Sequence, residues 1–253
     1  SGMTYTVEYT TIGTCPQTLA QDVTVITADD ASFTVTPTCD GGTVTITGLA
    51  GGTFALNPVP TDGAVIDAST GEVTGGTFGA TYTIEYTTSG TCPSVNTEDV
   101  TVLTLDDSSF TMTATCDGGT ATITGDVGGT FTLNPVPTDG AVIDAATGEV
   151  TGGTSAATYT IEYTTAGACP DSSTQNVTVL TADDPSFSVT PNCDGGTATI
   201  TGDTGGTFTL NPIPTDGAVI DSATGEVTGA TSATTYTIEY TTAGTCPQSS
   251  TQD

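Results

Sequence analysis

Short stretches in which hydrophobic and polar residues alternate recur along the whole chain. In SFTVTP, at 32–37, Phe33 and Val35 share one face, and GTVTITG at 42–48 and ATYTIEYTT at 80–88 alternate in the same way. Period-two alternation is typical of half-buried antiparallel strands. No segment has helical periodicity, and threonine and glycine, which disfavour helices, occur throughout. The pattern therefore predicts strands and no helices.

Turn-forming residues separate these stretches. They are Asp-Gly-Gly at 40–42, Thr-Asp-Gly at 61–63 and Thr-Gly-Glu at 70–72. Further strands are expected at 52–57 and 98–104, with a short pair flanking the last of these turns. Seven short strands with turns at regular intervals indicate a β-sandwich.

The aromatic residues of the stretch at 80–88 have two interpretations. Tyr82 and Tyr86 share a strand face with Ile84, which predicts that they are core residues. The alternative is a platform on which sugars stack. Threonines on the opposite face are expected to form the solvent side of the sheet, because β-branching suits strands without adding apolar surface.

The whole pattern repeats along the chain at a fixed interval. NPVPTDGAVIDASTGEVTGGTFGATYTIEYTT at 57–88 returns, with small changes, at 134–165 and at 211–242. A repeat of about 80 residues is too long for the coils of a solenoid, so each repeat is expected to be a domain of its own. The predicted fold is all-β, with tandem Ig-like antiparallel β-sandwich domains arranged as a beaded rod.

We place the repeat boundaries near the Asp-Asp pairs. The first residues align with 232–235, so we expect the start to be an interior cut of the array. The predicted domains are 1–28 (C-terminal strands of a preceding repeat), 29–105, 106–182, and 183–253, which lacks its last strand.

Charge excludes several classes of function. The 253 residues contain no lysine, arginine or histidine and 29 acidic residues, for a net charge of −29. Ser-His-Asp and Cys-His catalysis, Schiff-base lysines and histidine metal ligands are therefore impossible, and we expect no enzyme activity. Such a field repels phosphate backbones and anionic lipid surfaces, so neither nucleic-acid binding nor membrane-surface binding is expected. No run of about 18 apolar residues exists, so membrane insertion is not expected either. Calcium is the cofactor that an acidic surface can recruit.

Seven cysteines fall into two registers of the repeat. One register holds Cys15, Cys92, Cys169 and Cys246, and the other holds Cys39, Cys116 and Cys193. Two cysteines per repeat suggest disulfides in an extracellular protein. A thiolate metal site is the alternative, but CxxC spacing and histidine are lacking.

Three disulfide patterns are open. Strict Ig topology places the two cysteines of a repeat at opposite ends of one sandwich, which favours bridges between neighbours. The simplest arrangement has one bridge within each repeat, and we predict this one. The bridges would be Cys39–Cys92, Cys116–Cys169 and Cys193–Cys246, with the partner of Cys15 missing. The neighbour pattern is Cys39–Cys169 and Cys116–Cys246, and the short-loop pattern is Cys15–Cys39, Cys92–Cys116 and Cys169–Cys193.

Aspartate pairs open each repeat. We hypothesise that they join loop acids of the adjacent domain around calcium; the alternative is that they are solvated turn residues. No Asp-x-Asp-x-Asp-Gly loop is present. The residues concerned are Asp29, Asp30, Asp106, Asp107, Asp183 and Asp184.

LNPVPTDGAVIDASTGEVTGGTFGATYTIEYTT, followed by TCP, resembles the tandem Ig-like repeats of giant flavobacterial (Bacteroidota) surface adhesins. The resemblance covers every repeat. It implies an Ig-like sandwich, export to the cell surface, often by a type IX system, and a stalk or adhesive role.

These observations predict a structural repeat region of an extracellular, cell-surface adhesin, stalk or filament. Its expected partners are neighbouring repeats of the same chain and other copies in a fibre. The main alternative is a repeated glycan- or surface-binding module that gains by multivalency. Ice binding by the Thr-x-Thr faces is a weaker alternative.

Overall fold

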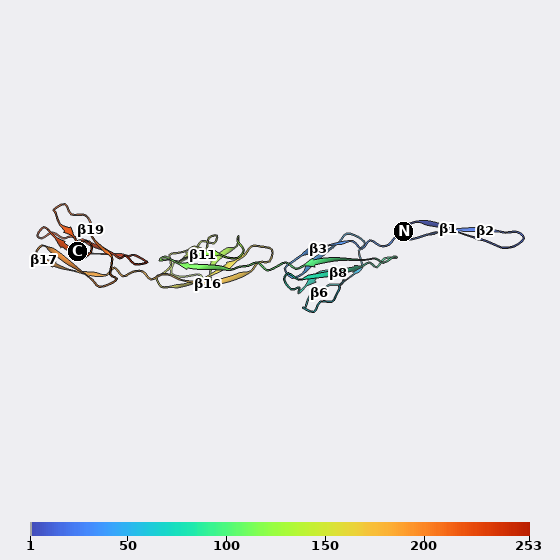
Figure 1. Ribbon diagram of the computed structural model, residues 1–253, viewed down its shortest axis with the longest axis horizontal. Coiled ribbons are helices and arrows are strands. Elements are labelled where there is room, and N and C mark those ends of the chain that lie inside the picture. The colour runs from blue at the N-terminus through green and yellow to red at the C-terminus, as the bar shows by residue number, and fades with distance from the viewer. Residues whose placement is uncertain (1) are drawn as a thin grey trace. The chain divides into compact units, whose positions relative to one another are not determined.

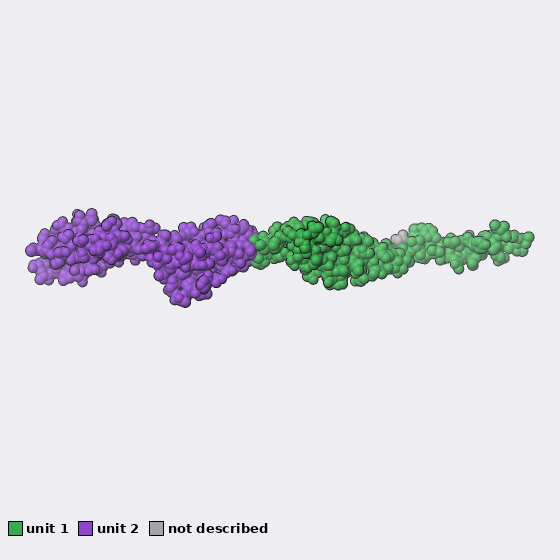
Figure 2. Space-filling model, turned by 90° about the horizontal axis from the view of Figure 1, so that it is seen from below, with its two compact units in different colours: residues 1–106, 167–170 green, residues 107–166, 171–253 purple. Residues whose placement is uncertain are grey.

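The computed structural model describes residues 2–253, which form β-strands joined by turns and loops (Figure 1). Residue 1, which belongs to the segment predicted at 1–28, lies outside the described residues. The chain divides into two compact units (Figure 2). One contains residues up to Asp106 together with Gly167–Pro170, and the other contains Asp107–Ala166 and Asp171–Asp253. These limits differ from the repeat boundaries because one loop of the second repeat belongs with the first.

The first repeat consists of two antiparallel sheets. The four-stranded sheet has the order β3-β4-β7-β6 and the three-stranded sheet the order β5-β8-β9. This is the ABED and CFG arrangement of an Ig constant-type sandwich, which confirms the predicted fold class and the seven strands. The strands are β3 (Phe33–Pro37), β4 (Gly42–Ile46), β5 (Thr53–Leu56), β6 (Val65–Ile66), β7 (Val73–Thr74), β8 (Thr81–Thr87) and β9 (Val95–Thr101).

The second repeat has the same two sheets, with orders β10-β11-β14-β13 and β12-β15-β16. Its longest pairing joins β15 to β16 from Thr158↔Thr178 to Thr164↔Ser172. The strands are β10 (Phe110–Ala114), β11 (Gly119–Ile123), β12 (Thr130–Leu133), β13 (Val142–Ile143), β14 (Val150–Thr151), β15 (Thr158–Thr164) and β16 (Ser172–Thr178).

The third repeat has the sheet orders β17-β18-β21-β20 and β19-β22-β23. The prediction that its last strand is lacking is wrong in part, because Ser249–Gln252 forms β23 and pairs with β22. The strands are β17 (Phe187–Asn192), β18 (Gly195–Ile200), β19 (Thr207–Leu210), β20 (Val219–Ile220), β21 (Glu226–Thr228), β22 (Ile238–Thr241) and β23 (Ser249–Gln252).

The described part of the segment at 1–28 is a single hairpin of β1 (Thr4–Thr10) and β2 (Thr18–Thr24). Its register pairs Tyr5 with Val23, as β8 and β9 pair Tyr82 with Val100. The hairpin therefore has the pairing of the last two strands of a repeat.

Each repeat has its own core, built around three aromatic rings. In the first repeat, the ring centroids of Phe33 and Phe54 are 5.7 Å apart and those of Phe54 and Tyr86 are 4.4 Å apart. Tyr86 and Ile84 have no exposed surface, and Tyr82 is buried too, which confirms the core assignment of this strand face. The Tyr86 hydroxyl donates to the Leu49 carbonyl and accepts from the Gly52 N–H, at 2.7 and 3.0 Å. The buried phenol is therefore fully hydrogen-bonded.

Candidate functional site

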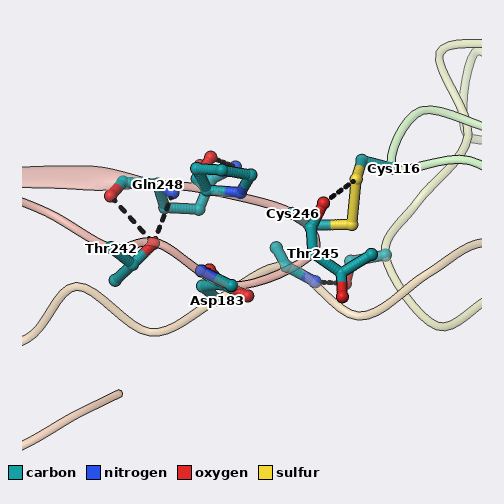
Figure 3. Close-up of a disulfide and its surroundings, with 10 residues drawn as sticks. Cys116, Asp183, Thr242, Thr245, Cys246 and Gln248 are labelled. Carbon is teal, nitrogen blue, oxygen red and sulfur yellow. Dashed lines mark hydrogen bonds between the residues drawn. A yellow bond between two sulfur atoms is a disulfide. The ribbon is translucent and has the colours of Figure 1, made fainter. Parts of the chain in front are cut away.

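The loop between the last two strands of a repeat is closed at its base by a threonine. Thr165 follows β15, and its hydroxyl oxygen accepts from the Asp171 N–H at 2.8 Å while its own N–H donates to the Asp171 carbonyl at 2.9 Å. Thr242 and Gln248 make the same pair of contacts in the third repeat (Figure 3). The loop at 165–171 thus has a fixed base, and Cys169 lies near its tip.

The first aspartate of each repeat holds this loop from the side. The Asp106 N–H donates to the Cys169 carbonyl at 2.9 Å, and the Gly167 N–H donates to Asp106 Oδ2 at 2.9 Å. A Cβ atom on Gly167 would lie 2.3 Å from that carboxylate, so a larger residue would displace the Asp106 side chain. Asp183 makes the same two contacts, with Cys246 at 3.0 Å and with Gly244 at 2.8 Å. Backbone and carboxylate together therefore set the position of the cysteine.

Two disulfides join neighbouring repeats. Cys39, which follows β3, is bonded to Cys169 with a Cα–Cα distance of 5.4 Å, and Cys116, which follows β10, is bonded to Cys246 at the same distance. Cys169 and Cys246 are each 1% exposed. Each bridge spans 130 residues of sequence and connects the loop between the first two strands of one repeat to the loop between the last two strands of the next. Figure 3 shows the second of them, Cys116–Cys246.

The predicted bridges within repeats, Cys39–Cys92, Cys116–Cys169 and Cys193–Cys246, are therefore wrong. The two cysteines of one repeat follow the first and the sixth strands and lie at opposite ends of the sandwich: the Cys92 carbonyl accepts from Asp29, before β3, whereas Cys39 follows β3. A strand of seven residues, such as β8, spans roughly 23 Å. A disulfide needs Cα atoms within about 7 Å. The loops of consecutive repeats meet this requirement and the loops of one repeat do not.

Three cysteines form no disulfide within residues 2–253: Cys15, Cys92 and Cys193. The Asp29 N–H nevertheless donates to the Cys92 carbonyl at 2.9 Å, as Asp106 and Asp183 do to their cysteines. Asp29 Oδ2 also accepts from the Thr88 hydroxyl at 2.9 Å. The loop of Cys92 is held like the loops of the bonded cysteines.

The second aspartate of each pair caps a local turn. Asp30 Oδ1 accepts from the N–H and the hydroxyl of Ser32, and these bonds, the hydroxyl first, lower the pKa of Asp30. Ser109 and Ser186 lower the pKa values of Asp107 and Asp184 in the same way. Among residues 2–253 no three acidic or thiol side chains are grouped so that they could hold a metal ion. The aspartate pairs therefore hold loops and turns, and the geometry assembles no calcium cage from them.

We expect calcium to leave the thermal stability of the chain unchanged. One oxygen of each paired aspartate already accepts a protein hydrogen bond, and calcium takes 6–8 oxygen ligands, which these residues do not bring together. Thermal unfolding with 1 mM calcium or with a chelator should give the same Tm. A rise of several degrees with calcium would contradict this expectation and restore the junction-calcium hypothesis.

A second constellation, which the strand pattern did not single out, ties the loop after β5 to the start of β8. The Tyr82 hydroxyl accepts from the Thr77 N–H at 2.9 Å and donates to Asp62 Oδ2. The equivalent Tyr159–Asp139 and Tyr236–Asp216 bonds recur in the other repeats. The aspartate and the tyrosine are separated by the same number of residues in every repeat. This constant spacing is the sequence signal from which the pair could have been predicted.

Replacing Tyr236 by phenylalanine is expected to raise the pKa of Asp216. The Tyr236 hydroxyl, and after it the Thr231 hydroxyl, lowers the pKa of Asp216 from 3.8 to about 2. Because the folded pKa lies below the unfolded one, the stability from this bond is present above pH 3.8 and is lost as the pH falls through about 2. Carboxyl NMR titration measures the shift, and Asp139 of the unchanged second repeat serves as the control. An unaltered Asp216 titration would contradict this account.

No protein-family model matches the sequence, and comparison with curated proteins finds no match either. Solved structures of tandem cadherin domains match this chain with low sequence identity and low TM-scores. Protocadherin gamma B2 extracellular domains 3–6 are 15% identical with a TM-score of 0.27, covering 85% of this chain and 68% of that one. Mouse cadherin-23 domains EC22–24 are 16% identical with a TM-score of 0.27, covering 85% and 90%. TM-scores this low carry no weight on function, and the fold follows from the strand order of the chain itself.

The described residues contain no helix long and apolar enough to cross a membrane.

Proposed function

We propose that this chain is a force-bearing structural repeat region of an extracellular protein, in which disulfides between neighbouring repeats limit extension. The observation that carries the proposal is the connectivity of the two bridges. Cys39–Cys169 and Cys116–Cys246 overlap in sequence, because Cys116 lies inside the segment closed by the first bridge and Cys169 inside the segment closed by the second.

Overlapping bridges shorten the covalent path through the chain. Between Cys39 and Cys246 the backbone includes the whole of the second repeat and most of both neighbours. The shortest covalent path from Cys39 to Cys246 passes through the first disulfide to Cys169, follows the backbone back to Cys116, and passes through the second disulfide to Cys246. The segment 116–169 is therefore the only backbone in this path. If the repeats unfold under tension, this path becomes taut first, and the remaining segments carry no load.

Composition supports an extracellular setting for this role. Disulfides persist in oxidising compartments and are rare in the cytosol. The net charge of −29, without a single basic residue, keeps neighbouring chains apart, more strongly at low salt. A cell-surface stalk or filament is the assembly that we propose for such a chain.

Repeated stretching and relaxation of single molecules tests this role. We expect the oxidised chain to recover its folded length in every cycle and to do so faster than the reduced chain. The reason is that closing a shorter loop costs less conformational entropy. Equal recovery with intact and with reduced bridges would contradict the proposal, because the disulfides would then contribute nothing to the mechanical response.

A further inference from the structure

A surface hollow recurs in all three repeats, between the loop after the third strand and the start of the sixth. In the first repeat its walls include Pro58, Pro60, Asp62, Tyr82 and Thr83, and its volume is about 270 Å³. The equivalent hollows of the second and third repeats have volumes of about 270 and 420 Å³. We call each of them a proline hollow, after the two prolines that line it.

Both ends of the loop that forms the hollow are tied to β8. At one end the Asn57 N–H donates to the Thr83 carbonyl at 3.0 Å, and the Asn57 side-chain amide donates to Glu85 at 3.1 Å. At the other end Asp62 accepts from the Tyr82 hydroxyl. The proline rings and the carboxylate are therefore held in place before any ligand arrives, which lowers the entropy cost of binding.

The negative charge in the hollow has no cationic partner. Asp62 accepts only from neutral donors, namely the hydroxyls of Tyr82 and Thr77 and the Ala64 N–H. These bonds, that of Tyr82 first, lower the pKa of Asp62, so the carboxylate stays ionised. The chain contains no lysine, arginine or histidine that could neutralise it.

The residue that accepts a hydrogen bond from one threonine of the hollow differs between the repeats. The Thr83 hydroxyl donates to Asp99 at 2.6 Å in the first repeat, and the Thr237 hydroxyl donates to Asp253 at 2.7 Å in the third. In the second repeat the equivalent acceptor is the Asn176 amide oxygen, at 2.8 Å. A lining threonine of the first and third hollows is therefore bonded to a carboxylate, and that of the second hollow to a neutral amide, so the first and third have one more negative charge nearby.

We propose that each proline hollow binds a lysine or arginine side chain of a partner protein. The charged head would bind the aspartate carboxylate, and the apolar stem would lie along the two proline rings. Long basic side chains bury their stems on apolar surface in this way while the head stays hydrated. The net charge of −29 attracts cations, and each hollow is lined by an aspartate carboxylate that can bind a cationic group. A basic side chain is therefore favoured over a neutral sugar as the ligand. One site per repeat lets a basic partner bind several repeats at once.

The test is an amide NMR titration of the intact chain with Nα-acetyl-lysine methylamide. We expect saturable shifts at Tyr82 and Thr83 and their counterparts, which weaken as salt is added. Affinity in the first and third hollows should exceed that in the second by about two- to fivefold, the effect of one further exposed charge. Asp99→Asn should lower the affinity of the first hollow, and Asn176→Asp should raise that of the second.

Two controls are built into the chain and the probe. Asp67 is an exposed carboxylate with a pKa of about 2 but no proline hollow beside it, so its surroundings should shift much less. The same probe with its side-chain amine acetylated is neutral and should not bind. The proposal is overturned if the neutral probe or a methyl glucoside shifts the hollow equally, if Asp67 responds as strongly, or if Asn176→Asp changes nothing.

Discussion

Reducing both junction disulfides is expected to lengthen the stretched, unfolded chain by about 540 Å. With both bridges intact the load-bearing path from Cys39 to Cys246 contains only the backbone of 116–169, and without them it contains all of 39–246. The difference is about 150 residues, each of which adds roughly 3.5 Å when extended. The gain is large because each bridge spans most of two repeats.

Single-molecule stretching at a force that unfolds every repeat measures this length before and after a reductant is added. The matched control is the double variant Cys39→Ser with Cys116→Ser, whose length should not respond to the reductant. If the oxidised chain already extends over the whole of 39–246, the bridges do not form and the mechanical role fails.

Replacing Tyr163 by alanine is expected to destabilise the second repeat by about 3–5 kcal/mol. Tyr163 is fully buried against Phe110 and Phe131. Its hydroxyl donates to the Asp126 carbonyl at 2.7 Å and accepts from the Gly129 N–H at 3.0 Å. The substitution leaves a cavity and two backbone groups without partners. Since a domain of this size has a total stability of about 5–15 kcal/mol, much of this repeat's stability is lost.

Denaturant unfolding of the Tyr163→Ala chain measures the loss. Val142→Ala is the control, because Val142 is 58% exposed and its truncation should change the unfolding free energy by less than about 0.5 kcal/mol. Tyr163→Phe separates the two causes, since it removes only the hydroxyl and should cost about 1–3 kcal/mol. An equal effect of Tyr163→Ala and Val142→Ala would contradict the description of this core.

The strands could be predicted because one face of each is buried. The stretch predicted at 80–88 is β8 at Thr81–Thr87, and that predicted at 32–37 is β3 at Phe33–Pro37. Alternation reports burial directly, so it also identified Tyr82 and Tyr86 as core residues. Because the sequence repeats at a fixed interval, the equivalent strands of the other repeats could be predicted as well.

The bridges could not be predicted from alternation, because connectivity depends on which loop tips meet in space. The alternation places Cys39 after a first strand and Cys169 after a sixth strand, and only the Ig topology inferred from those strands indicates that these two loops are neighbours. Topology favoured this pairing, and the preference for one bridge per repeat was the wrong criterion. The contacts of the aspartate pairs could not be predicted for a related reason: their partners include backbone groups such as the Gly167 N–H, which composition does not reveal.

The proline hollow also escaped sequence reasoning. Its walls come from two separate segments, 58–62 and 80–83, and the residue bonded to one of its threonines, Asp99 or Asn176, comes from a third element. Only the assembled sandwich brings these residues together.

The contour length of the single variant Cys246→Ser tests the connectivity most directly. With overlapping bridges, losing the second one leaves a path across the first bridge and along 169–246, so the chain should lengthen by only about 24 residues, or about 80 Å. Bridges within repeats would act independently, and losing Cys193–Cys246 would add about 53 residues, or about 190 Å. The short-loop pattern leaves Cys246 unpaired, so the variant would then have the original length. A gain of about 80 Å is the expected result, and either the larger gain or no gain would contradict the connectivity.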